Sequence, residues 1–511
     1  MVKMKKISTY LLLALGLMLG LGSCFKDLGN YDYTEINEAV IGDAGFGKPY
    51  DCRTGIDRLT IHPDITFTKD SEGQGTYSYE WVAVGQNNQR GERFTLARER
   101  DLDYEVNLKE DRYILYLKVK DEATDMVFSK DVELNVRSSY SLGWILGGEV
   151  DGKGQVDMVS ISSQTLFLHE TLKLEEGLEL GPVELVWIDN DSWTSDGRLY
   201  VSTAEGSWKF DRVDFNGSPY TSLRYSFAIT PDEGIFHLTD SQKIWDKRHI
   251  LIMDGHACNV STTGGMIENS FSYWQDDPQK KLFKTASFML CNHRMKDIRC
   301  FVFYNDESKE FCFISGMAIS GMKRLGDEEE DTYSWKTTTE HPGGLDMVAA
   351  ITSFFGNGQA AALMKSPQEE YYLYCTTPDN TGTISNEGKY EIGPAAPEFG
   401  QSVSWAITTN HGYLLYAAGK HLYGLDFRKT PQKAVLLETF DAPISLIKAD
   451  NVSPEQFDDM FYVATYDDSR TRSGVLYKYQ MVDSPDRIAA EKKETWDKGF
   501  LKIKSMCWKA F

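Results

Sequence analysis

The chain has 511 residues, a formal net charge of -22 and a hydrophobic content of 41%. This acidic balance argues against nucleic acid as a partner, because nucleic-acid binding depends on clustered Lys and Arg. It also argues against a disordered chain, since aromatic residues make up 13% of the sequence and can fill a large core.

The N-terminus has the pattern of an export signal. Three lysines lie within the first six residues, ahead of the apolar run 11–21, which is too short to cross a bilayer. The run ends in "LGSC" (21–24), which resembles the lipobox of bacterial lipoproteins. The resemblance implies that residues 1–23 are removed as a signal peptide and that Cys24 is acylated. The alternative is a generic export signal followed by an ordinary cysteine.

The residues after Cys24 indicate where the anchored chain is displayed. Phe25-Lys26-Asp27 is similar to the short basic-acidic signal that sends lipoproteins of the Bacteroidota to the outer cell surface. This implies an outer-membrane location with exposure at the cell surface, with the lipid as the only membrane contact. A periplasm-facing anchor is the alternative. Residues 24–35 are then a tether, and no later hydrophobic stretch is long enough to span a membrane.

The other cysteines give no metal or disulfide pattern. No Cys-x-x-Cys and no zinc-finger spacing occurs. We expect packed thiols, because free cysteine behaves as a small core hydrophobe. A disulfide within the segment 291–312 stays open. The seven residues are Cys52, Cys258, Cys291, Cys300, Cys312, Cys375 and Cys507.

Residues 36–138 read as short alternating strands. Strands are expected at 77–84, which contains Trp81, at 104–108, at 113–121 and at 129–136. Period-two alternation with frequent turn clusters predicts a β-sandwich.

Residues 139–511 contain a repeat. Stretches 197–211, 413–426 and 460–479 each have an apolar residue, a tyrosine, a small-residue strand, a turn and a second strand with an aromatic residue. The matching tyrosines are Tyr200, Tyr416 and Tyr462, with Tyr374 as a less clear fourth. Successive spacings of 42 and 46 residues from Tyr374 onward match one four-stranded propeller blade.

The spacing predicts a β-propeller with seven blades. Blade starts fall near 183, 235, 298, 347, 403 and 444. The C-terminal strand from Gly499 pairs with segments near 141, which closes the ring and removes the open sheet edges. Six or eight blades, or two stacked β-sandwiches, are the alternatives.

No motif identifies a catalytic or metal site. The segment 189–197 ("DNDSWTSDG") starts like a calcium loop but lacks its later ligands, so we expect a turn. The acidic run 327–331 reads as a solvated loop. His249 and His256 flank a predicted hairpin without a third ligand, and no spacing selects a carboxylate pair for glycoside hydrolysis. We therefore expect no catalytic residues, metal or cofactor.

Adjacent aromatic residues give one weak ligand-binding candidate. Tyr273 and Trp274 lie together in "SFSYWQDD" (270–277), and stacking on such rings is a common way to hold sugars or peptide side chains. The alternative is that one ring packs in the core and the other shields it.

The chain resembles the PKD-like family of Bacteroidota surface lipoproteins. The resemblance rests on "CFKDLGNYDY" (24–33), on the Trp81 strand and on the strands "RYILYLKVKD" (112–121) and "VELNV" (132–136). It implies an immunoglobulin-type sandwich and a non-catalytic accessory lipoprotein of a SusC/SusD-type importer of glycans or peptides, which binds ligand or docks on the transporter beside sibling lipoproteins. A propeller-based hydrolase or lyase acting on extracellular glycan or peptide is the alternative.

Overall fold

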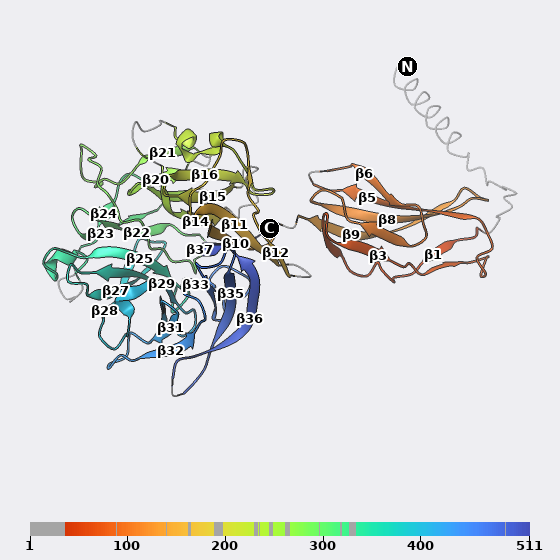
Figure 1. Cartoon of the computed structure of the whole chain (residues 1–511). Coiled ribbons are helices and arrows are strands. Elements are labelled where there is room, and N and C mark those ends of the chain that lie inside the picture. Colours follow the sequence, from red (N-terminus) through yellow and green to blue (C-terminus); the bar gives the residue numbers. More distant parts are fainter. Residues whose placement is uncertain are drawn as a thin grey trace, which may run out of the picture. The chain divides into compact units, whose positions relative to one another are not determined.

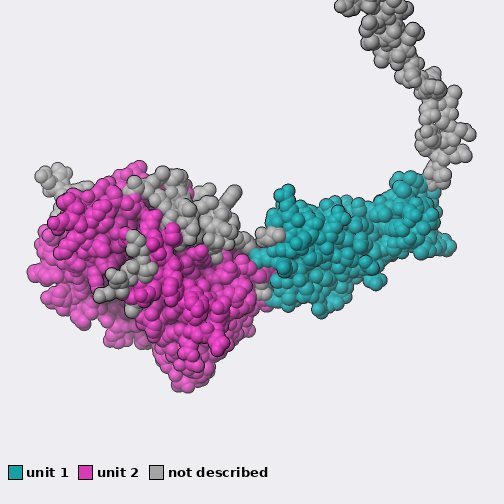
Figure 2. Space-filling view, turned by 90° about the horizontal axis from the view of Figure 1, so that it is seen from above, with its two compact units in different colours: residues 1–136 teal, residues 137–511 magenta. Residues whose placement is uncertain are grey.

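The computed structural model describes residues 36–510, apart from 88, 139, 162–164, 189–197, 229–233, 235, 245–248, 261–265, 296, 317–318, 327–333 and 486. The chain divides into two compact units between Val136 and Arg137 (Figure 2). Each is built from β-strands, as expected (Figure 1). Short 3-10 turns are found at η1 (Pro219–Thr221), η2 (Leu223–Ser226), η4 (Thr337–Thr339) and η5 (Phe399–Gln401).

The first unit is the expected β-sandwich. Its largest sheet has the order β2 (Tyr50–Arg53), β9 (Val127–Arg137), β8 (Asp111–Asp121), β5 (Tyr77–Gly85) and β6 (Arg93–Ala97). Two antiparallel pairs complete the unit: β1 (Ala39–Ile41) with β4 (Ile65–Phe67), and β3 (Arg58–Ile61) with β7 (Leu102–Glu105).

Alternation along the strands builds the sandwich core. In β8, Tyr113, Leu115, Leu117 and Val119 are all 0% exposed, whereas the intervening side chains are half-buried or exposed. Trp81 is also fully buried and stacks on Phe46 with ring centroids 6.0 Å apart. The period-two pattern therefore has its usual cause, a strand with one face in the core.

The second unit contains seven successive antiparallel sheets, which are the blades of the propeller, counted over the described residues. Blade one is β12 (Thr165–Leu168), β11 (Lys153–Ile161), β10 (Gly143–Val150) and β37 (Lys502–Lys509). Blade two is β14 (Val183–Ile188), β15 (Arg198–Thr203) and β16 (Gly206–Asp211). Blade three is β18 (Leu238–Lys243), β19 (His249–Met253), β20 (His256–Val260) and β21 (Ile267–Ser270).

The remaining blades follow in chain order. Blade four is β22 (Cys300–Asn305), β23 (Glu310–Ser315) and β24 (Lys323–Arg324). Blade five is β25 (Asp346–Thr352), β26 (Ala360–Lys365), β27 (Tyr371–Pro378) and β28 (Ile384–Ile392). Blade six is β29 (Ser402–Ile407), β30 (Leu414–Ala418), β31 (His421–Leu425) and β32 (Ala434–Thr439). Blade seven is β33 (Ile444–Ala449), β34 (Met460–Thr465), β35 (Gly474–Val482) and β36 (Ala489–Phe500). A short parallel pair joins β13 (Lys173–Leu174) to β17 (Asn216–Gly217).

Packing between the blades forms a closed ring. Seven hydrophobic clusters each join two successive blades, and the last of them joins blade seven to blade one. That last cluster packs Tyr462 of β34 against Trp144 of β10, with ring centroids 5.0 Å apart. A ring of packed sheets is the expected propeller, with seven blades.

The C-terminal strand completes blade one, as predicted. Strand β37 pairs antiparallel with β10 and contacts β14 and β33, the first strands of the two neighbouring blades (Figure 1). Strand β37 is therefore the innermost strand of blade one. In the other blades the first strand in the sequence has this position.

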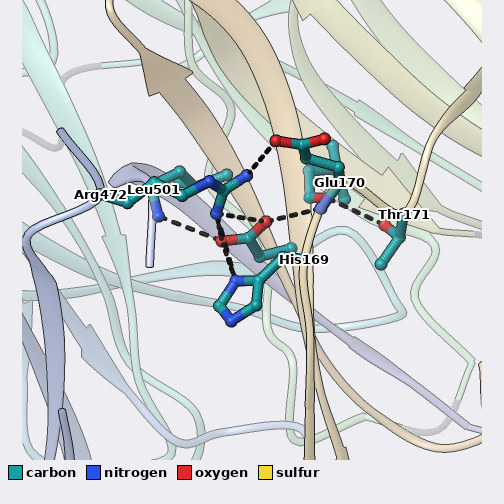
Figure 3. A network of polar contacts seen from close by, with 7 residues as sticks. His169, Glu170, Thr171, Arg472 and Leu501 are labelled. Carbon is teal, nitrogen blue, oxygen red and sulfur yellow. Dashed lines mark hydrogen bonds and ion pairs between the residues drawn. The ribbon is translucent and has the colours of Figure 1, made fainter. Parts of the chain in front are cut away.

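A polar network fixes the same junction (Figure 3). Asp157 of β11 is fully buried and lies 3.2 Å from Arg472 Nη1, just before β35. The same carboxylate accepts the Leu501 N–H at 3.1 Å and the Glu170 N–H at 3.0 Å, and it lies 3.2 Å from His169 Nδ1. One buried carboxylate thus connects the ends of the propeller.

Candidate functional site

The inner strands of the propeller share one irregularity that aligns them. In each of six blades, one residue near the start of the inner strand is skipped in the pairing with the next strand. A shared shift of this kind, typical of a β-bulge, fixes the register from blade to blade. The skipped residues are Glu184, Thr239, Val348, Val403, Ser445 and Lys504.

The residue directly after the shift faces the next blade. In three blades it is polar and accepts a backbone N–H from that neighbour, so it links consecutive blades near the axis. The bonds run from Met289 N to Asp240 Oδ2 (2.9 Å), from Ile447 N to Ser404 Oγ (2.8 Å) and from Val186 N to Ser505 Oγ (3.1 Å).

Two residues further on, the same face of the strands carries Gln242 in blade three, Lys448 in blade seven and Cys507 in blade one. His293, ahead of β22, lies 3.0 Å through Nε2 from Gln242 Oε1. We name Asp240, Gln242, His293, Lys448 and Cys507 the axial cluster. All five are half-buried, so solvent reaches them although they lie on inner segments of the ring.

Hydrogen bonds order one side of the axial cluster. The Gln242 side-chain amide donates to Asp240 Oδ1 at 3.3 Å, and its oxygen accepts from His293 Nε2, because an amide oxygen can only accept. Asp240 Oδ1 also accepts the Ser241 N–H at 2.8 Å. The carboxylate, amide and imidazole therefore form a chain with defined donor directions.

Burial dominates the electrostatics of the axial cluster. It raises the pKa of Asp240 to about 6 and lowers the pKa of Lys448. Burial, with a smaller contribution from the Lys448 charge, lowers the pKa of His293 to about 4. It raises the pKa of Cys507 to about 12, which leaves that thiol protonated and unreactive at neutral pH.

The Lys448 ammonium is the unpaired member of the cluster. Its charge acts on Asp240, His293 and Cys507, which belong to blades three, four and one. Lys448 therefore lies within electrostatic range of groups from three other blades. Within the described part of the chain, Lys448 Nζ makes no hydrogen bond and no ion pair, whereas Lys504 on the adjacent inner strand pairs with Glu149 at 2.9 Å.

Sequence reasoning did not find the axial cluster. Its members come from four blades and follow no spacing rule, so only the closed ring brings them together. A weak signal existed in β33, "ISLIKA", where Lys448 is the one charged residue of an inner strand.

The weak candidates Tyr273 and Trp274 lie between β21 and β22. Both are half-buried and pack on the hydrophobic cluster between blades three and four. Trp274 contacts Phe283 with ring centroids 4.8 Å apart, and the Arg324 guanidinium lies 3.9 Å from its ring centroid. One face of Trp274 is thus occupied by a cation from the same chain.

A more open aromatic pair lies in blade two. Tyr220 is 81% exposed on η1 and Tyr225 is 66% exposed on η2. Ser218 and Ser222 cap the two turns through their hydroxyl groups, and Leu223, the first residue of η2, is fully buried. We name Tyr220 and Tyr225 the tyrosine platform. Its sequence signal was "SPYTSLRYS" (218–226), in which capping serines surround both tyrosines.

Several other sequence predictions concern residues outside the axial cluster and the tyrosine platform. Cys24, residues 25–27, the segment 189–197 and the acidic run 327–331 lie outside the described residues. His249 pairs with Val260 and His256 with Met253, so the two histidines lie at opposite ends of the β19–β20 hairpin and do not meet.

The cysteines pack as expected in the described chain. Six of the seven predicted thiols are buried, Cys507 is half-buried, and all seven are free of disulfide bonds. Among the described residues, no group of three His, Cys, Asp or Glu side chains is arranged to hold a metal ion. No helix in this part of the chain is long and apolar enough to cross a membrane.

Comparison with protein families gives one match. The model of the PKD-like family matches residues 24–181, which is less than half of the chain. The match starts at Cys24 and continues past the sandwich through blade one. A search of curated proteins found no significant match.

Solved structures show general likenesses at low sequence identity. A quinoprotein alcohol dehydrogenase-like protein from Bacteroides thetaiotaomicron is 11% identical, with a TM-score of 0.38 over 89% of this chain and 96% of its own. The extracellular domain of a one-component system from the same organism is 11% identical, with a TM-score of 0.33 over 70% of this chain and 47% of its own. An Agrocybe aegerita lectin that recognises non-reducing terminal N-acetylglucosamine is 12% identical, with a TM-score of 0.41 over 70% of this chain and 91% of its own. At these scores the likenesses carry no functional conclusion, and the fold assignment rests on the sheets of this chain.

Proposed function

We propose that the chain is a non-catalytic, lipid-anchored outer-membrane protein, displayed at the cell surface as an accessory component of a SusC/SusD-type uptake complex for glycans or peptides. The observation that carries this proposal is the start of the PKD-like match at Cys24. The lipobox resemblance places acylation and the start of the mature chain at the same residue. Two independent sequence features therefore favour one mature N-terminus.

The architecture supports a binding or docking role. A tether and a sandwich precede a ring whose blades are joined by seven apolar clusters, so the ring can offer a firm surface to a partner. The tyrosine platform supplies two exposed rings on capped turns, and Tyr is enriched at recognition surfaces because it has an apolar body and a polar tip.

Extraction of native membranes with a mild detergent tests the proposal. We expect a tagged chain to purify together with a SusC/SusD-type pair, and a Cys24→Ala variant to leave the membrane fraction. A Tyr220→Ser/Tyr225→Ser variant should lose co-purification or ligand binding while its thermal unfolding stays unchanged. Purification of the tagged chain alone, with no ligand bound, would overturn the transporter role.

One observation favours a second candidate function, a propeller-based hydrolase or lyase acting on extracellular glycan or peptide. Asp240 is a carboxyl group inside the ring whose pKa burial raises to about 6, a property common among general acids. This candidate predicts turnover of a glycan or peptide that an Asp240→Asn substitution abolishes. A broad substrate screen without product would remove it.

A further inference from the structure

We propose that the axial cluster binds the carboxylate group of a ligand, with the Lys448 ammonium as the anion-binding group. This inference deepens the ligand-binding part of the proposed function and rests on it. It identifies a site inside the ring and a chemical class of ligand.

Lys448 differs from its polar neighbours in lacking a hydrogen-bond partner within the described residues. His293 donates to Gln242, and Gln242 donates to Asp240, so these groups already have partners. In the chain as described, Lys448 Nζ has none. An ammonium group offers three donors and is costly to keep away from water without an acceptor. A ligand anion would supply the missing acceptor.

The position of Lys448 on its strand also favours a ligand-binding role. Lys448, Gln242 and Cys507 occupy equivalent places on three inner strands, because the shared register shift aligns them. All three remain half-buried. Lys448 therefore occupies the strand position that carries an amide side chain in blade three and a thiol in blade one, and solvent still reaches all three side chains.

The charges around Lys448 favour a carboxylate over a more highly charged anion. Asp240 lies close enough for its charge and that of Lys448 to influence each other. The Asp240 carboxylate repels any anion, but a ligand carboxylate brings one negative charge to the Lys448 ammonium, whereas a dianionic phosphate brings two and is repelled more strongly. Hydroxyl groups next to the ligand carboxylate could donate to Asp240, which has further lone pairs.

Two sources of such a carboxylate fit the proposed uptake role, the uronic acid of a glycan and the C-terminus of a peptide. Isothermal titration of the full purified chain separates them. The probes are glucuronate with glucose as its neutral partner, and a short free-acid peptide with its C-terminal amide as the neutral partner. We expect one of the two acids to bind and its neutral partner to bind at least about tenfold more weakly, because a charge-assisted hydrogen bond is lost.

Two substitutions make the test specific. Lys448→Met keeps the apolar stem and removes the charge, and it should weaken binding of the acid by roughly 10- to 100-fold. Lys504→Met is the matched control, since this lysine lies on an adjacent inner strand but already pairs with Glu149. It should change binding by less than about threefold. Lys448→Arg keeps the charge and should retain most of the affinity.

These outcomes decide whether the carboxylate site exists, and they do so independently of the proposed role at the transporter. Equal binding of acid and neutral partner, unchanged binding by Lys448→Met, or binding of neither acid would overturn the inference. Thermal unfolding would reveal a misfolded Lys448→Met chain. In that case the Lys448→Arg variant decides the test, and a large loss of acid binding by a folded Lys448→Arg chain would overturn the inference. Carboxylate binding without co-purification with a transporter would remove the SusC/SusD role and leave this site intact. Co-purification without carboxylate binding would remove this site and leave the SusC/SusD role intact.

Discussion

Arg472 lies 3.2 Å from Asp157, although 315 positions separate them in the sequence, and their contact joins blade seven to blade one. Asp157 is fully buried and also holds the backbone N–H groups that precede β37 and follow β12 (Figure 3). The pair therefore lies at the junction where segments from both ends of the propeller chain meet.

Removal of the Arg472 charge should destabilise the propeller strongly. In an Arg472→Met variant, Asp157 stays buried without its cationic partner, and breaking a buried pair in this way typically costs about 3–5 kcal/mol. Chemical denaturation at neutral pH measures the loss. Arg470→Ala is the control, because Arg470 and its partner Asp467 are more exposed, and it should change the free energy of unfolding by less than about 1 kcal/mol. Similar effects for the two variants would contradict the closing role of Arg472.

Loss of β37 should open the ring. Deleting residues 501–511 exposes one edge of β10 and removes Ile503, Met506 and Trp508 from the last hydrophobic cluster. We expect the cooperative thermal transition of the propeller to disappear. A synthetic peptide of residues 499–511 should restore part of it, because it can occupy the vacant innermost place. An unchanged transition in the truncated chain would show that closure does not depend on this strand.

His411 should contribute stability only at acidic to neutral pH. It contacts Asp459 through Nδ1 and Asp483 through Nε2, the latter at 3.0 Å. Burial alone would lower its pKa, but the hydrogen bonds and charges of the two carboxylates outweigh burial, so the pKa of His411 is raised. A raised pKa stabilises the fold below the unfolded value near 6.5, and this contribution is lost as the pH rises through the folded value.

A His411→Gln variant tests this dependence. It should lose about 1–2 kcal/mol relative to the natural chain at pH 5.5 and much less at pH 9, measured by denaturant titration at both values. His421→Gln is a useful comparison, since His421 has one carboxylate partner, Glu398, and is more exposed. A loss that stays constant across the range would mean that the imidazole acts by packing alone.

The thiols should resist modification in the native state. Burial raises the pKa of Cys258 and of Cys375 to about 12, and the other described thiols are likewise shifted upward. Iodoacetamide should therefore label the native chain very slowly. After denaturation, mass spectrometry should find seven labelled cysteines if Cys24 is acylated and all eight if it is not. Rapid native labelling would contradict the packed-thiol assignment.

The tyrosine repeat led to the correct fold although its alignment was partly wrong. Tyr200 and Tyr462 pair with equivalent positions of their inner strands, Trp187 and Lys448. Tyr416 is one position away and packs toward the preceding blade instead of the following one. The blade count was unaffected, because a shift of one residue along a strand changes only the face on which the side chain lies.

Tyr374 was wrongly placed in the repeat. It lies in β27, the third strand of blade five, whereas the second strand of that blade is "AAALMK" (360–365). Small alanines there leave room for neighbouring large residues such as Tyr304 and Phe311, so no tyrosine is needed at the usual place. Local pattern could not show this, because the compensating residues come from the preceding blade.

The strands were predictable because alternation of apolar and polar residues is a local pattern. The closure of the ring was predictable because the C-terminal strand had no other blade in which to pair. The axial cluster and the tyrosine platform depend on how distant segments meet and on which rings remain uncovered. Tyr220 and Tyr273 look alike in sequence, since each follows a serine by one or two positions. Their exposure differs because Tyr273 packs on a cluster supplied by two blades, while Tyr220 extends from a turn.

The place of β37 has a consequence for the order in which the chain folds. Synthesis runs from the N-terminus, so the innermost strand of blade one is made after the strands of the other six blades. The sandwich, whose strands end at Arg137, can fold before then. The ring cannot close until β37 is present, so a chain cut short during synthesis would expose the unpaired edge of β10.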